Sequence, residues 1–407
     1  MFRNSFFFPE EEETTSNEGE DCHTAFIRDT ASERVLKEYD GPFFHLRYPA
    51  VRKHCEQCHT TKGNLSLCAQ CQVVYYCCRG CQQHHWVVHR AICRYTCSAV
   101  KQYQSEELAL QKRKYFDDPL LRTNFSNLTE SRAFLQALSN CIEAYISVNT
   151  EKSLQEAVKL GFKALYHCRK DDMCFRYVLP ALLLRLDMDQ ECFDMILWYA
   201  MYGKAFRYDN PNKPFLSLWG NDRASLVDHM DHPQLTFIMA DVILKHRLLV
   251  LCRQKEALYT FILCMDKTYK QQPRGNLQGV YRYVYKCLLG DKLRYAECRD
   301  PVQIDRTIYK TMKQGEKVNR LLWKSMANSS PIFGLAAPED PGNANSFREV
   351  HFHLVRFKCL LRYIPDTLQY IAAFCQKEYG EVAKDIPGAV LSKAADKEQQ
   401  HQKKKRR

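Results

Sequence analysis

The sequence predicts a mainly α-helical protein that carries a small cysteine-rich module ahead of its helical region. Two observations support this fold class. Apolar residues recur at helical spacing through much of residues 98–380, and soft metal ligands gather between Cys55 and Cys93. The chain has 407 residues, of which 45% are hydrophobic. This is enough for two or three domains with a substantial core.

The two ends of the sequence lack the composition of a packed core. Residues 1–50 begin with an acidic segment rich in Ser, Thr and Glu, and we expect them to be largely disordered apart from a short helix at 31–39. Residues 381–407 are predicted to form a disordered basic tail, which is either a nuclear-import signal or a solvated end. No apolar run is long enough for a membrane span, and Phe6–Phe8 is too short for a secretory signal.

Cysteine usage predicts the compartment. Of the 20 cysteines, nine lie between Cys55 and Cys97, and the others are scattered singly, mostly in apolar surroundings. Scattered cysteines in helical patterns usually act as small buried hydrophobes rather than disulfide partners. The sequence therefore predicts a reducing location inside the cell, in the cytoplasm, the nucleus or both.

The region after the cysteine-rich module has the periodicity of packed helices. One helix face is predicted to comprise Phe134, Leu138, Cys141 and Tyr145. Thr150 and Ser153 flank the start of the next helix, Asp171 or Asp172 can cap a helix that Pro180 kinks, and another helix follows Asp189. Short turns between helices predict antiparallel hairpins in a helical array or solenoid-like domain, without a strict 34-residue repeat.

The later helices are expected at 233–266, 275–289, 302–327, 346–363 and 366–379. Residues 205–232 interrupt the pattern with Pro and Gly and are expected to be a long insertion, and residues 328–345 are expected to be a loop. His351 and His353, two residues apart, are expected to face apart near a surface.

The cysteine-rich module, residues 51–97, contains four chelating pairs. They are Cys55 with Cys58, Cys68 with Cys71, Cys77 with Cys81, and His89 with Cys93. Each Cys-x2-Cys pair suits a tight knuckle, and the last two pairs have i, i+4 spacing, which places both members on one face of a helix. Eight N and S ligands are what two tetrahedral zinc sites require.

Which pairs share a metal depends on the segment between Cys71 and Cys77. Val73–Tyr76 has the composition of a strand, and a strand advances about 3.3 Å per residue. An extended path would carry Cys77 about 20 Å from Cys71. This favours an interleaved arrangement, although a hairpin could bring these two pairs together. Cys78, His85 and Cys97 are the competing ligands nearby, and the spacing favours Cys77, His89 and Cys93 over them.

Two Cys-x2-Cys knuckles followed by Tyr76-Cys77-x3-Cys81-Gln82-x3-Trp86-x2-His89-x3-Cys93 resemble the MYND-type zinc finger over about 40 residues. The resemblance implies a short β-hairpin plus helices, and two interleaved structural zinc ions. One would be held by Cys55, Cys58, Cys77 and Cys81, and the other by Cys68, Cys71, His89 and Cys93.

The same resemblance implies a binding surface. Members of the family bind short proline-containing peptides through the residues that correspond to Gln82 and Trp86. Some members also use a small polar residue inside the second knuckle, where this chain has Ala69.

Other functions fit the sequence less well. A lysine methyltransferase with a MYND finger inside a SET domain should show an Asn-His motif and a late cysteine cluster, and neither is present. No nucleophile elbow, phosphate-binding loop or His-Glu-x2-His motif occurs.

Residues 393–407 hold seven bases against two acids and supply part of the net charge of +12, whereas the zinc-loaded finger would carry only about +2. This charge distribution argues against binding to nucleic acid. We therefore predict a non-enzymatic adaptor that binds a partner protein, while a divergent methyltransferase and a nucleic-acid-associated regulator remain the alternatives.

Overall fold

The computed structural model describes residues 51–115, 125, 128–168, 171, 173–202, 233–268, 300–338 and 340–380, with the backbone alone at 201–202 and 254–268. The expected disordered ends 1–50 and 381–407, the insertion 205–232 and the helix 275–289 lie outside these residues. Contacts between Cα atoms divide the chain into Met1–Leu46 with Gln254–Arg294, and Arg47–Arg253 with Tyr295–Arg407. The second of these units holds the cysteine-rich module and the helices that follow it.

The described part of the chain is mostly helical and has a two-stranded hairpin in the cysteine-rich module, which confirms the predicted fold class. The strands are β1 (Ser66–Leu67) and β2 (Tyr75–Tyr76). They pair antiparallel, with Ser66 opposite Tyr76. The first long helix, α3, runs without a break over Arg79–Lys112. It passes through residue 97, where the sequence suggested that the finger ends.

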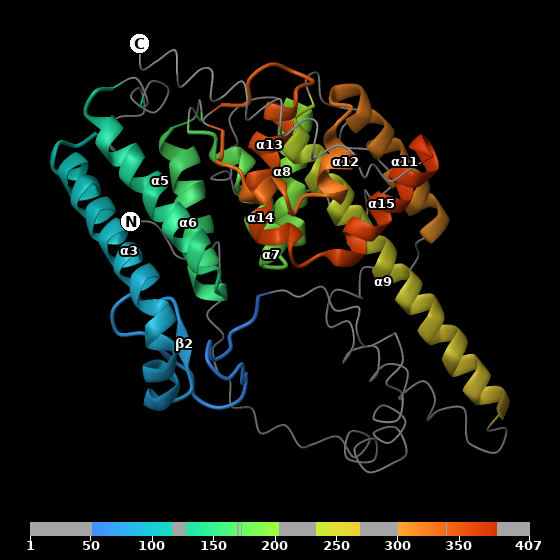
Figure 1. Ribbon diagram of the computed structural model, residues 1–407, viewed down its shortest axis with the longest axis horizontal. Helices are drawn as coiled ribbons and strands as arrows, with labels where there is room; N and C mark the ends of the chain where they lie inside the picture. Colours follow the sequence, from blue (N-terminus) through green and yellow to red (C-terminus); the bar gives the residue numbers. More distant parts are fainter. Residues whose placement is uncertain are drawn as a thin grey trace. The chain divides into compact units, whose positions relative to one another are not determined.

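The next two helices form an antiparallel hairpin. Helix α5 (Ser131–Val148) ends at Asn149 in the left-handed conformation, and α6 (Glu151–His167) starts after Thr150. Thr150 and Ser153 form the reciprocal hydrogen bonds of a capping box, as their spacing suggested. Helix α5 packs against both α3 and α6, and the three helices lie side by side in Figure 1.

A short segment then leads to the middle of the helical region. Both carboxylate oxygens of Asp171 accept hydrogen bonds from backbone N–H groups at the start of the 3₁₀ turn η2 (Phe175–Tyr177), at 2.7 and 3.0 Å. Helix α7 (Leu179–Arg185) follows. Pro180 lies in its first turn, where a missing N–H costs no hydrogen bond, so it does not kink a longer helix. Helix α8 comprises Asp189–Tyr202.

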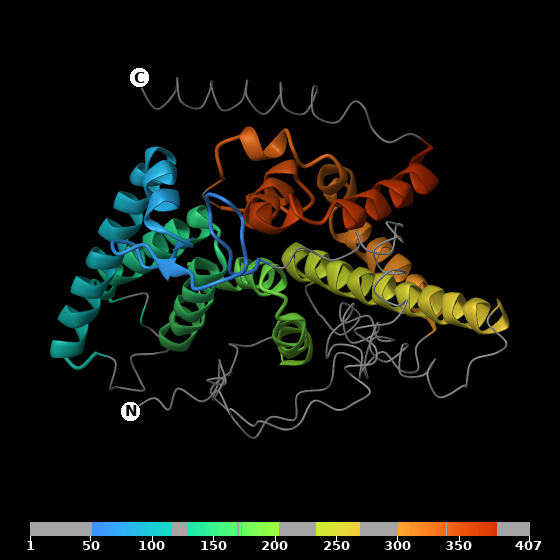
Figure 2. The same ribbon diagram turned by 90° about the horizontal axis from the view of Figure 1, so that it is seen from below.

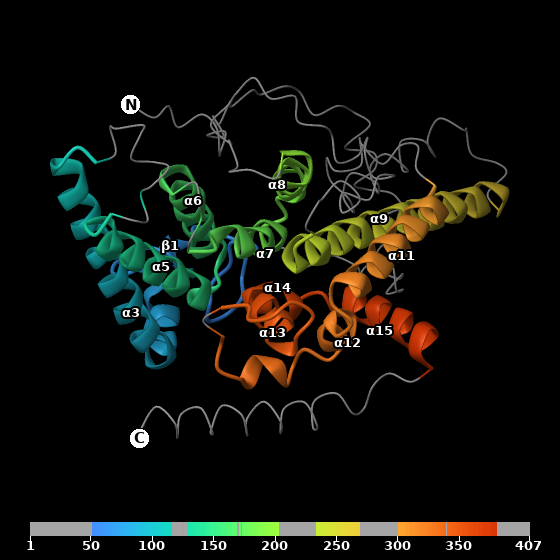
Figure 3. The same cartoon turned by 90° about the horizontal axis from the view of Figure 1, so that it is seen from above.

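The remaining helices include three that side-chain hydrogen bonds join to the first half of α9, and Figure 3 shows α11 lying alongside α9. Their bounds are α9 Leu235–Thr268, α11 Pro301–Val318, α12 Leu322–Ala327, α13 Phe347–Arg356, α14 Lys358–Leu361 and α15 Pro365–Tyr379, with a 3₁₀ turn η6 at Ile332–Gly334. The expected helix 302–327 is thus two helices. Asn319 separates them, because its side chain accepts a hydrogen bond from the backbone of Leu321 and donates to Ser346.

The helical core contains polar pairs as well as apolar side chains. Lys245 and Asp241 of α9 form an ion pair at 2.5 Å, with both side chains almost completely buried. Arg247 donates to Asp189 at 2.5 Å and to the carbonyl oxygen of Leu184 at 2.7 Å. Such pairs replace the hydration that burial removes, which is why charged groups are tolerated inside this core.

The expectation for His351 and His353 was wrong. Both are buried, at 5% exposure each. The ring Nδ1 of His353 hydrogen bonds to Thr236 Oγ1 at 2.6 Å, and burial lowers the pKa of His353 to about 3. Because α13 is covered on more than one side, a separation of two residues does not bring either ring to solvent.

The cysteine-rich module is joined to the helical region by more than the chain. Thr150 Oγ1 donates to the carbonyl oxygen of Val73 at 2.5 Å, and the backbone N–H of Val51 donates to the carbonyl oxygen of Arg185 at 3.3 Å. In Figure 2 the blue hairpin lies beside the green helices that follow it in the chain. One residue therefore caps α6 and holds the hairpin at the same time.

Candidate metal centre

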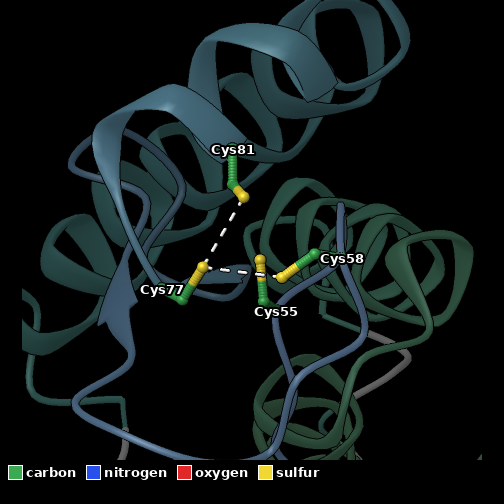
Figure 4. Close-up of side chains that lie close together, drawn as sticks. All are labelled: Cys55, Cys58, Cys77 and Cys81. Atoms are coloured by element: carbon green, nitrogen blue, oxygen red, sulfur yellow. Dashed lines mark hydrogen bonds between the residues drawn. The ribbon is translucent and has the colours of Figure 1, made fainter.

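The first four-residue set combines three short segments of chain. Cys55 and Cys58 come from the first knuckle, Cys77 directly follows β2, and Cys81 lies in the first turn of α3. Figure 4 shows their four sulfur atoms pointing toward one another. The Sγ atom of Cys77 lies 3.5 Å from that of Cys58 and 3.5 Å from that of Cys81. All four ligand atoms lie within 4.8 Å of one another.

The second set is more deeply buried. It joins Cys68 and Cys71 of the second knuckle to His89 and Cys93, which lie one turn apart on α3. Cys68 Sγ lies 3.9 Å from Cys93 Sγ, and Cys71 Sγ lies 3.5 Å from His89 Nε2. The structure thus groups the first pair with the third and the second pair with the fourth.

These distances fit a tetrahedral metal ion. With Zn–S bonds of about 2.3 Å, two sulfurs on one tetrahedron are ~3.8 Å apart. Four separations between ligand atoms, two in each set, run from 3.5 to 3.9 Å. The first set offers four thiols, and the second offers three thiols and one imidazole. Zinc prefers such sulfur and nitrogen donors. Each set could therefore hold one zinc ion with all four positions filled by protein.

Electrostatics in the first set shows why a cation suits it. Burial alone would raise the pKa of Cys55, but backbone N–H groups of Cys58, Cys77 and Gln57 lower it to about 6. The hydrogen bond shared with Cys58 raises the pKa of Cys77 to about 11, and the bond shared with Cys77 raises the pKa of Cys81. Cys55 therefore ionises readily, whereas Cys77 and Cys81 need a positive charge nearby before they can follow.

The second set has the same arrangement. Burial opposes ionisation of Cys68, yet backbone N–H groups of Cys71 and Gln70 lower its pKa. Burial raises the pKa of Cys71 to about 11, and burial with the neighbouring thiols raises the pKa of Cys93. Burial also lowers the pKa of His89, which keeps the imidazole in the neutral form that binds metals.

The competing ligands take other roles. Cys78 lies outside both sets, and its Sγ accepts a hydrogen bond from the backbone N–H of Cys81 at 3.4 Å, so it caps the start of α3. His85 stacks on His89, and its Nδ1 hydrogen bonds to the hydroxyl of Tyr76 at 2.9 Å. Cys97 belongs to neither set. Sequence reasoning missed the capping role of Cys78. The signal that could have found it is a side chain with an acceptor atom directly before the first turn of a helix.

The two candidate peptide-binding residues lie beside the second set. Gln82 and Trp86 are half-buried and one turn apart on α3. The Trp86 ring meets the His89 ring edge to face, with centroids 6.1 Å apart. Ala69 is exposed in the second knuckle, where its carbonyl oxygen accepts a hydrogen bond from the Gln72 side chain at 3.0 Å. The indole is therefore positioned by the ligand helix and still reaches solvent.

Comparison with known protein families gives one match. The family model of the MYND finger matches residues 55–93. Residues 55–93 are a MYND finger. MYND fingers are zinc-binding modules that mediate interactions between proteins. Searches of curated proteins and of solved structures return no match.

The described residues outside the finger show no comparable cluster of metal ligands. Among the helices that the structure describes, none is both long and apolar enough to span a membrane. The sixteen cysteines whose side chains the structure describes form no disulfide bond.

Proposed function

We propose that the protein is an adaptor whose MYND finger holds two structural zinc ions and binds a short, proline-containing segment of a partner protein. Cys55, Cys58, Cys77 and Cys81 hold one ion, and Cys68, Cys71, His89 and Cys93 hold the other. The observation that carries the proposal is the pair of closed four-ligand sets on α3, the helix that also carries the half-buried Gln82 and Trp86.

The metals act as structure rather than as catalysts. All four positions of each site are filled by protein, which leaves no position for a water nucleophile. A module this small has little core of its own, so metal binding supplies folding free energy on the order of 10 kcal/mol per site. Zinc thus fixes the turn of α3 on which Gln82 and Trp86 lie.

The expected ligand follows from the surface. An exposed indole packs well against a proline ring, and a neighbouring amide can hydrogen bond to the backbone of an extended peptide. The helical region offers a second, larger surface for a protein partner. Helix α3 continues from the finger into this region and packs against α5. The free thiols of the described residues support an intracellular location.

A peptide-binding experiment tests the proposal. The zinc-loaded full chain would be titrated by fluorescence anisotropy against a panel of labelled proline-containing peptides, beside a Gln82→Ala, Trp86→Ala variant. Gln83→Ala, an exposed neighbour, is the matched control. We expect binding that is lost in the double variant and kept in the control. Equal binding by both variants, or none by the zinc-loaded chain, would refute the peptide site.

A further inference from the structure

Helix α3 exposes two different faces, and only one of them belongs to the proposed peptide site. Successive residues of an α-helix are offset by about 100°. Tyr95, nine residues after Trp86, therefore lies on the opposite side of the helix, and Val88 lies near Tyr95. The buried residues of α3, from His89 to Leu110, lie on a third side, where His89 and Cys93 face the second knuckle and the helix packs against α5.

The face around Tyr95 is apolar and open to solvent. Val87 is 87% exposed, Val88 is 74% exposed and Tyr95 is 46% exposed, and Ala91 lies exposed between them. Single exposed apolar residues are ordinary, but four of them within about two turns make a continuous patch. Two adjacent valines also lower helix propensity, so they bring no benefit to an exposed helix by themselves. We call Val87, Val88, Ala91 and Tyr95 the valine face.

A basic ridge borders the valine face. Arg90, Arg94 and Lys101 are exposed along α3, and its first acidic residue is Glu106. Within the residues that the structure describes, none of these three cations makes an ion pair. The surface therefore combines an apolar strip with unneutralised positive charge on one flank.

We propose that the valine face docks an acidic amphipathic helix of a partner protein. The apolar side of such a helix would cover Val87, Val88 and Tyr95, while its carboxylates would meet Arg90, Arg94 and Lys101. A second copy of this chain is a poorer occupant, because pairing α3 with itself would bring like charges together. Nucleic acid would engage the cations but leave the valines uncovered.

Designed peptides test this proposal on the zinc-loaded full chain. The probe is a labelled 18-residue helix with Leu at i, i+3, i+4 and i+7 positions and Glu on its flanks. The comparison peptides replace each Glu by Lys, or scramble the same composition. Binding would be measured by fluorescence anisotropy at ~150 mM salt, where weak non-specific attraction is largely screened.

Three variants localise the binding. The first is Val87→Ser, Val88→Ser, Tyr95→Ser, and the second is Arg90→Glu, Arg94→Glu. Gln104→Ser, an exposed α3 residue outside the face, is the matched control. Retention of two zinc ions and of the circular dichroism spectrum shows that each variant is folded.

We expect the acidic peptide to bind the unmodified chain at least tenfold more tightly than the first variant. The charge-reversed variant should prefer the Lys peptide, whereas Gln104→Ser and Gln82→Ala, Trp86→Ala should bind like the unmodified chain. The proposal is overturned if no acidic peptide binds or if the serine variant binds equally well. Equal binding of duplex DNA by the unmodified chain and the serine variant would overturn the proposal in favour of nucleic acid. A dimer in sedimentation that the serine variant abolishes would overturn it in favour of a second copy of this chain.

Discussion

Cys77 and Cys78 are adjacent cysteines in different environments. Cys77 Sγ lies among the sulfurs of the first set, while Cys78 Sγ points back to the start of α3 and accepts a hydrogen bond from the Cys81 backbone. We expect Cys77→Ser to bind one zinc ion per chain, because a hydroxyl is a poor ligand for zinc. Cys78→Ser should bind two, since serine is itself a good helix cap.

Zinc content measured by mass spectrometry on purified protein checks this expectation. A zinc-loaded preparation of the unmodified chain is the control. Two zinc ions in Cys77→Ser would show that Cys78 can replace its neighbour, and one zinc ion in Cys78→Ser would show that Cys78 is itself a ligand.

His246 predicts acid sensitivity in the helical core. Its ring hydrogen bonds to Thr367 Oγ1 at 3.0 Å, and burial lowers its pKa to about 4, with the nearby Arg253 adding to the shift. The unfolded chain, with a histidine pKa of about 6.5, then binds more protons between these two values. The contribution of the neutral His246 ring to stability should therefore be fully present above pH ~6.5. The free energy of unfolding should fall by on the order of 3 kcal/mol as the pH decreases to about 4.

A His246→Gln variant isolates this contribution. Glutamine does not titrate and can still hydrogen bond to Thr367, so urea unfolding of the variant should depend less steeply on pH. Zinc release at low pH affects both proteins alike and cancels in the comparison. Parallel pH curves for the two proteins would contradict the assignment.

The two four-residue clusters were accessible to sequence reasoning because the geometry of each chelating pair depends on local spacing. Pairs such as Cys77 with Cys81 have their geometry fixed within one turn of chain. The environment of His353 was not accessible, because its partner Thr236 lies 117 residues away. Local spacing determines which residues can share a metal, whereas the burial of a histidine depends on contacts that no local pattern records.

At the scale of elements, Thr150 connects two structures. Its hydroxyl completes the capping box of α6 and donates to the carbonyl oxygen of Val73 in the finger. We expect Thr150→Val to lower the free energy of unfolding by about 2 kcal/mol, since the cap and the buried hydrogen bond are each worth about 1 kcal/mol. Thr150→Ser keeps the hydroxyl and should stay within ~0.5 kcal/mol of the unmodified chain.

Urea unfolding of the zinc-loaded proteins measures both values. A loss in Thr150→Ser with none in Thr150→Val would mean that the methyl group, not the hydroxyl, carries the stability of this junction.

Helix α3 shows what an element-level prediction can miss. The i, i+4 spacing of His89 and Cys93 predicts a helix there, and the structure has it. The stripe of Thr96, Ala99, Tyr103 and Leu110 continues the buried face past residue 97, but the change from metal ligands to apolar residues hides this continuity. One helix can serve a metal site with one half and a helical core with the other.

At the scale of the molecule, zinc removal should have a bounded effect. In the proposed zinc-loaded state, the half of α3 that carries His89 and Cys93 depends on the metals, while Ala99, Tyr103 and Leu110 are buried where α3 packs on α5. We expect a strong chelator to remove amide protection from residues 51–96 and leave α3 beyond Ala99 protected. The far-UV circular dichroism signal of the helices should stay largely intact.

Hydrogen exchange with mass spectrometry, before and after chelation, checks this expectation. Return of the lost protection on adding zinc is the control for irreversible damage. Loss of most of the helical signal would show that finger and helices unfold as a single unit.

The fold class followed from periodicity, because amphipathic helices such as α5 carry their buried face in their own sequence. The separation of α11 from α12 did not follow, since it depends on the hydrogen bonds of Asn319 to residues on both sides of a long loop. Local sequence patterns do not predict helix boundaries that depend on tertiary hydrogen bonds.

The unbroken course of α3 also sets a distance. At about 1.5 Å per residue, the nine steps from Trp86 to Tyr95, on opposite sides of the helix, span ~14 Å of rigid helix. A ligand with two recognition motifs, one for each exposed face, would meet sites held at constant separation and orientation. Its gain in avidity would depend on whether its linker matches that separation. The protein would then select partners by the spacing of their motifs as well as by their sequence.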